Sequence, residues 1–137
     1  ILGEDGLGKT IYFEHEIGTD QVNEDGTVTT IESNIQSYDF DLQGQTGAGE
    51  KFVSVSRFIP DFKDLEGNAT VTLAVKRYPS ETGISSTHSP FIINSSTDKV
   101  DTRARGRYVS VKIANTDINQ EWRYGTLTLD VKPDGMR

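Results

Sequence analysis

The chain has 137 residues, about the length of one domain, and 34% of them are apolar, which suffices for a modest core. Its formal charge of −7 argues against a protein that binds nucleic acid or an anionic membrane through a basic surface. Cysteine is absent from the sequence, which excludes disulfides and thiolate metal sites, and no apolar run approaches the roughly 18 residues of a membrane-spanning helix.

A motif that resembles a phosphate-binding loop stands at the beginning of the chain. Residues 3–10 (Gly-Glu-Asp-Gly-Leu-Gly-Lys-Thr) match the pattern G-x-x-x-x-G-K-[ST], whose backbone N–H groups and lysine hold phosphates. That function requires a helix after the loop, whereas residues 11–15 are rich in β-formers, and Glu4 and Asp5 would repel an anion. We therefore interpret the motif as a glycine-rich turn before the first strand, and we expect no nucleotide or other cofactor.

Two acidic segments follow, and neither predicts a metal site. If the chain is extended here, Glu14 and Glu16 share one face and His15 lies on the other, so the three cannot ligate one ion together. Residues 20–26 resemble a calcium loop, but they lack its alternating ligands and its flanking helices. We interpret them as a hairpin turn.

Apolar and polar side chains alternate along most of the chain, with the period of two that is typical of β-strands. The clearest strands have one apolar face and cover residues 69–76, 109–113 and 126–131. Weaker candidates cover residues 10–15, 27–31, 35–42, 52–59 and 91–94. Turns are predicted at residues 25–26, 66–68, 105–106 and 133–135, and loops at residues 44–49 and 78–90.

No segment predicts an amphipathic helix, so the strands and turns together decide the fold class. Seven or eight short strands predict that residues 1–137 form a single all-β domain. We expect an antiparallel β-sandwich of jelly-roll or immunoglobulin-like topology. We expect no enzyme, because the carboxylates of Asp61 and Asp64 lie in a predicted turn and nothing indicates the cleft that a glycosidase requires.

The sequence has one basic cluster, formed by Arg103, Arg105 and Arg107. A single neighbouring aromatic residue, Tyr108, is too little for a nucleic-acid platform. On an extended strand the three guanidinium groups share one face, where they are suited to pair with acidic groups of a neighbouring subunit. A subunit interface is therefore one hypothesis, and solvated or intramolecularly paired arginines are the equally open alternative.

Trp122 is the only tryptophan and stands just before the last predicted strand. A residue of this kind most often anchors the core of a sandwich. The functional alternative is a sugar-stacking platform that Trp122 forms with Tyr124 and Tyr12.

Several segments of the chain resemble one family of virion proteins. They are residues 103–107 (Arg-Ala-Arg-Gly-Arg), 122–125 (Trp-Arg-Tyr-Gly), 129–137 (closing in Pro-Asp-Gly-Met-Arg), 13–20 and 57–62. Together they resemble the C-terminal end of structural proteins of short-tailed bacteriophages, of the tail nozzle or tail tubular protein B kind. Met136 is a departure, because the closing motif of that family more commonly has arginine there.

This resemblance implies a non-enzymatic structural component of the phage tail, located in the virion. Sister copies would form a ring around the DNA exit channel, next to other tail or portal-complex proteins. DNA would pass through this channel without specific binding, and the protein would have no membrane anchor. Since the sequence begins abruptly at Ile1, we also expect it to be the C-terminal domain of a longer protein. The alternative function is a carbohydrate- or receptor-binding β-sandwich module on the virion.

Overall fold

The computed structural model describes residues 2–4, 10–12, 18–41, 51–78, 81 and 86–135. Its strands are β1 (Leu2–Glu4), β2 (Thr10–Tyr12), β3 (Asp20–Val22), β4 (Val28–Thr30), β5 (Ser33–Gln36), β6 (Val53–Ile59), β7 (Phe62–Glu66), β8 (Ala69–Lys76), β9 (Ser86–Ile93), β10 (Val100–Gly106), β11 (Tyr108–Asn115), β12 (Glu121–Tyr124) and β13 (Thr128–Pro133). Strands make up 61% of the structure and the described residues contain no helix, which confirms the predicted all-β class.

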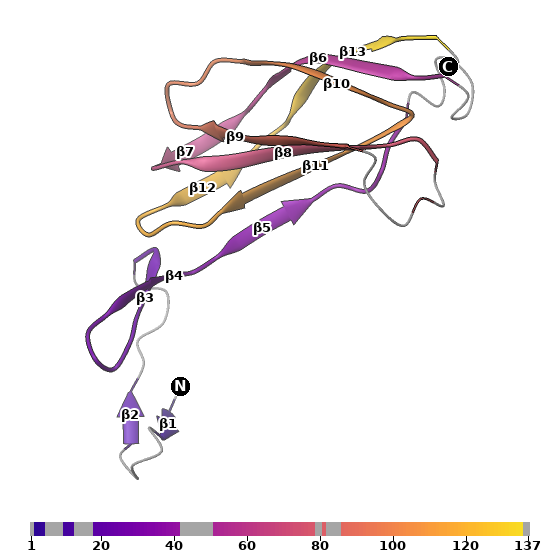
Figure 1. Ribbon diagram of the computed structural model, residues 1–137. Coiled ribbons are helices and arrows are strands. Elements are labelled where there is room, and N and C mark those ends of the chain that lie inside the picture. Colours follow the sequence, from indigo (N-terminus) through magenta and orange to yellow (C-terminus); the bar gives the residue numbers. More distant parts are fainter. Residues whose placement is uncertain are drawn as a thin grey trace.

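Two antiparallel sheets form the body of the molecule. The larger sheet has the strand order β5-β11-β8-β9, and the smaller one has the order β10-β6-β13. Figure 1 shows the two sheets stacked, with the β3–β4 hairpin lying beyond one end of the stack. The chain passes between the sheets from β9 to β10 and again from β10 to β11. The predicted antiparallel sandwich is confirmed.

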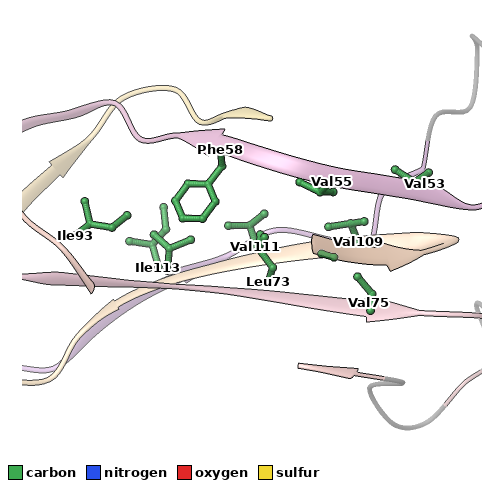
Figure 2. Close-up of a cluster of buried hydrophobic side chains, with 11 residues drawn as sticks. Val53, Val55, Phe58, Leu73, Val75, Ile93, Val109, Val111 and Ile113 are labelled. Carbon is green, nitrogen blue, oxygen red and sulfur yellow. The ribbon is translucent and has the colours of Figure 1, made fainter. Parts of the chain in front are cut away.

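The core lies between the two sheets and is formed mainly by inward residues of β6, β8 and β11, together with Ile93 of β9 and Ala104 of β10. Figure 2 shows side chains of β6 pointing toward those of β8 and β11. Phe58, Val55, Leu73 and Val109 have no exposed surface, as the predicted inner faces require. Burying each of these side chains contributes about 1.5–3 kcal/mol, so this layer supplies most of the hydrophobic stabilisation.

The prediction of a loop at residues 78–90 is wrong for its last five residues, because β9 begins at Ser86. The prediction rested on serines and on Pro90, which cannot donate a hydrogen bond to a sheet. β9 is an edge strand, and its pairing with β8 shifts register between Val71 and Leu73, opposite the proline. An edge position with such an irregularity accommodates a proline, so the strand runs through it.

Strand β10 was not predicted, and its sequence explains why. Its inward positions are Thr102, Ala104 and Gly106, all buried but too small or polar to produce an apolar alternation. Gly106 is required where the chain crosses to the other sheet, because a Cβ atom there would lie 2.7 Å from Cβ of Val75. The predicted turn at 105–106 is thus a tight strand-to-strand crossing.

A corner connects the small β7–β12 ribbon to the sandwich. The backbone N–H of Gly125 donates to the carbonyl of Asp61 (2.8 Å), and that of Thr126 donates to the Asp61 carboxylate (3.2 Å). A Cβ on Gly125 would meet this carboxylate at 2.5 Å and the Asp61 carbonyl oxygen at 3.1 Å, so a larger residue would have to displace the Asp61 side chain. Asp61 therefore has a structural role, and the corner positions Trp122 and Tyr124.

Candidate interaction surfaces

The first surface is the arm, which we define as residues 18–32 and which includes the β3–β4 hairpin. None of its residues is buried. Val22 and Val28 pair across the hairpin with 63% and 50% of their surface exposed, and Ile31 is 53% exposed. Apolar side chains clustered on a projecting element are typical of a surface that another molecule covers.

The turn of the arm is well ordered by local hydrogen bonds. Gly26 has a positive φ of 81°, and the Asn23 N–H donates to the carbonyl of Thr27 (2.8 Å). The Asp25 carboxylate accepts from the backbone N–H of Thr27 (2.9 Å) and from its hydroxyl. These hydrogen bonds, that of the hydroxyl first, lower the pKa of Asp25. Residues 20–26, which we interpreted as a hairpin turn, do lie in a hairpin: residues 20–22 form β3, and the turn covers residues 23–27.

A buried amide ties the arm to the sandwich. Oδ1 of Asn115 accepts from the backbone N–H of Ser33 (3.0 Å), from the Ser33 hydroxyl and from Nε1 of Trp122 (3.3 Å). Its Nδ2 donates to the carbonyl of Ile31 (3.4 Å). Asn115 is only 4% exposed, so these bonds form largely away from water. The predicted set of site residues does not include it, although it occupies the inward position after Val109, Val111 and Ile113 in the alternation, where a polar residue is a signal.

Strand β5 continues from the arm along the edge of the larger sheet. It pairs with β11, but all four of its side chains are exposed. The following residues stay on this edge, because Phe40 and Val109 exchange two backbone hydrogen bonds of 2.9 Å. Tyr38 is nevertheless 95% exposed and Ile35 is 48% exposed. The edge therefore adds a second group of uncovered apolar side chains.

Arg103 and Arg105 of the predicted cluster lie on the outer side of the smaller sheet, and Arg107 lies in the connection from β10 to β11. Arg103 and Arg105 are exposed on β10, with buried residues between and beside them. Arg105 forms an ion pair with Asp134 and also donates to the Asp134 carbonyl (3.0 Å). This intramolecular pair leaves 44% of the Arg105 side chain exposed.

Aromatic rings connect the second and third arginines. The guanidinium carbon of Arg105 lies 4.3 Å from the ring centroid of Phe52, and that of Arg107 lies 5.3 Å from it. Arg107 also lies 5.6 Å from the ring of Tyr78, which is 57% exposed. Lys132 extends this surface across the smaller sheet. Ser54 of β6 pairs with Arg105 of β10 on one side and with Lys132 of β13 on the other, so Arg105 and Lys132 lie on the same face. We call this surface the arginine patch: Phe52, Tyr78, Arg103, Arg105, Arg107 and Lys132.

Trp122 and Tyr124 lie together in the β7–β12 ribbon. Both rings contact Phe62 edge-to-face: its ring centroid lies 6.1 Å from that of Trp122 and 5.9 Å from that of Tyr124. Both also pack against the core. The Tyr124 hydroxyl accepts from the backbone N–H of Leu127 (2.9 Å). A hollow of about 400 Å³ lies between Trp122 and the arm, with Gln120 and Glu121 also at its wall. The two aromatics thus anchor the ribbon, and Trp122 also borders a partly polar hollow.

The remaining predicted sites fall largely outside the described residues. Glu14, His15 and Glu16 lie there, as do residues 5–9 of the phosphate-loop motif. The flanks of that motif, β1 and β2, pair antiparallel, and Thr10 begins a strand instead of a helix. The described part of the chain contains no group of three His, Asp or Glu residues placed to hold a metal ion. It also contains no helix that is long and apolar enough to cross a membrane.

No protein-family model matches the chain, and a search of curated proteins finds no match.

Proposed function

We propose that this chain is a structural component of a bacteriophage tail, which assembles with sister copies around the DNA exit channel. Other tail or portal-complex proteins are its neighbours, and its location is the virion. It acts through the shape and chemistry of its surfaces, without catalysis. Two observations support the proposal. The arginine, Trp-Arg-Tyr-Gly and Pro-Asp-Gly segments resemble those of short-tailed phage tail proteins, and the arm and the edge of the larger sheet expose apolar side chains.

The distribution of exposed apolar side chains carries the proposal. The described residues contain ten large apolar side chains that are exposed, and six of them lie within residues 18–41: Val22, Val28, Ile31, Ile35, Tyr38 and Phe40. Such side chains are normally scattered singly over a monomer, and a concentration on one segment marks a contact surface. A subunit that is complete only within an assembly has this pattern.

The charge of the chain fits a protein beside passing DNA. With a formal charge of −7, its average surface repels the phosphate backbone. A channel lined by such subunits would let DNA slide without binding it. Specific DNA contacts are not part of this proposal.

Electron cryomicroscopy of the virion that contains this chain tests the proposal. We expect several copies in a ring around the tail axis, with the arm of each copy in contact with another protein. Density for the chain in the capsid shell alone, or an arm that contacts only solvent, would contradict the proposal.

A receptor- or carbohydrate-binding module is the second candidate, favoured by the hollow beside Trp122. The hollow combines an aromatic wall with the polar side chains of Gln120 and Glu121, as sugar sites do. Glu121 is exposed and its side chain has no hydrogen bond in the described part of the chain, so Glu121→Ala is expected to leave the fold intact. Glycan-array binding that Glu121→Ala abolishes would support this candidate, and a wild-type protein that binds no glycan would eliminate it.

A further inference from the structure

We propose that the arm of one copy docks head to tail on the arginine patch of a second copy. This inference rests on the proposed function and deepens it, because it names the two surfaces that join sister copies. Three observations carry it: the separation of charge along the chain, the apolar character of both surfaces, and their places in the fold.

Charge is divided sharply between the two parts of the sequence. Residues 1–50 contain eleven acidic side chains and one lysine, a formal charge of −10. Residues 51–137 contain ten acidic and thirteen basic side chains, a charge of +3. The arm itself carries Asp20, Glu24, Asp25 and Glu32 and no basic residue. The arginine patch carries four cations, and in the described part of the chain Arg103 and Lys132 form no ion pair.

Both surfaces also present apolar groups beside their charges. On the arm, Val22, Val28 and Ile31 are at least half exposed. On the patch, Tyr78 is 57% exposed and the ring of Phe52 lies under two guanidinium groups. Interfaces between proteins combine such an apolar centre with charges at the rim, and Tyr and Arg are enriched in them. The two surfaces therefore match in charge sign and in chemical character.

The two surfaces lie at opposite ends of the sandwich, so they cannot meet within one copy. Asn115, which holds the arm, ends β11, whereas Arg107 directly precedes the first residue of that strand. Eight residues of strand separate them, a distance of about 26 Å. Figure 1 shows the β3–β4 hairpin at one end of the sheets and the turn from β10 to β11 at the other.

A contact between different surfaces of identical copies is heterologous. Such contacts repeat from copy to copy and close into a ring when the rotation allows it. An arm that meets the patch of the next copy therefore gives a geometric reason for a ring, which a two-fold contact would not. Attraction between exposed charges also makes the contact sensitive to salt.

Charge reversal on each surface tests the inference. The arm variant is Glu24→Lys/Glu32→Lys, which spares Asp25 because that carboxylate orders the turn. The patch variant is Arg103→Glu/Lys132→Glu. All four side chains are exposed, so circular dichroism is expected to show an unchanged fold. Asp98→Lys and Lys112→Glu, exposed residues away from both surfaces, are the matched controls.

Sedimentation equilibrium measures the result. We expect each reversed variant alone to associate at least 10-fold more weakly than the wild type, while both controls associate as the wild type does. Mixing the two variants should restore association, because the intact arm of one meets the intact patch of the other. A variant with all four substitutions should also associate again, through the reversed charges.

The outcomes separate this inference from the proposed function. A wild-type protein that assembles while both reversed variants assemble equally well would overturn the arm-to-patch contact and leave the tail role untouched. Reversed variants whose mixture fails to associate would overturn the head-to-tail arrangement. A virion with no ring of this chain would contradict the proposed function, whatever the charge variants do in solution.

Discussion

The buried amide of Asn115 provides a quantitative test of how the arm is held. We expect Asn115→Ala to lower the free energy of unfolding by about 2–3 kcal/mol. The substitution removes the acceptor of three donors: the Ser33 N–H, the Ser33 hydroxyl and the Trp122 indole N–H. The hydroxyl of the exposed Ser33 can turn to water, so the two N–H groups account for most of the loss. An unsatisfied buried donor costs about 1–3 kcal/mol, and the low end applies because both residues are only partly buried or exposed and regain water.

Urea denaturation followed by Trp122 fluorescence measures this loss, since Trp122 is the only tryptophan and is itself a partner of the amide. Asn34→Ala is the matched control, because Asn34 lies next to Ser33 on β5 and is exposed. The control is expected to change stability by less than about 0.5 kcal/mol. If Asn115→Ala also changed it by less than about 0.5 kcal/mol, the amide would not hold the arm as described.

Three further predictions concern the sandwich. Gly106→Ala is expected to cost about 1–3 kcal/mol by overpacking against Val75, and a neutral result in thermal denaturation would show that the crossing can move aside. Phe58→Ala should cost about 3–5 kcal/mol in the same assay, whereas a loss below about 1 kcal/mol would mean that this core is not closely packed. The hydrogen bond from Arg57 lowers the pKa of Asp101 below its usual 3.8, so the pair stabilises the fold above that pH and the contribution disappears as the pH falls through the lowered pKa. NMR titration should show the Asp101 midpoint rising in Arg57→Gln, and an unchanged midpoint would refute the assigned cause.

The sequence predicted the strands whose inner faces carry large apolar residues. Val71 and Leu73 in β8, and Val109 and Ile113 in β11, alternate without interruption, and each is buried. Such a pattern has no stable alternative to a strand with one face in the core. Strand β6 was a weaker candidate, because its register shift places Val55 and Phe58 three positions apart.

Strands without large inward-facing apolar residues were not predicted from this alternation. In β10 the inward residues are small or polar. At Gly106 a larger residue would not fit, because the backbone there lies too close to the Val75 side chain. In β9 the polar composition and Pro90 indicated a loop, although pairing with β8 satisfies the backbone. Contacts with neighbouring strands determine that both segments form strands, and these contacts cannot be read from the local pattern of apolar and polar residues.

The candidate surfaces were predictable only in part. The arginines were singled out from charge alone, and the structure adds the rings of Phe52 and Tyr78 between them. Residues 27–31 were a weaker strand candidate, and in the described part of the chain no second sheet covers Val28 or Ile31 of this segment. Whether an apolar face is covered depends on which sheets pack together, and this information is absent from a short sequence window.

The arm is the surface through which the proposed assembly forms, and sedimentation velocity tests this role most directly. For this measurement the arm variant removes apolar groups instead of charges, as Val22→Ser/Val28→Ser/Ile31→Ser. The control is Ile59→Ser/Ile92→Ser, which removes similarly exposed apolar groups from β6 and β9. We expect the wild type and the control to form larger species as concentration rises, while the arm variant sediments as a 15.2 kDa monomer. An arm variant that assembles as the wild type does, or a wild type that stays monomeric at every concentration, would show that the arm does not join copies.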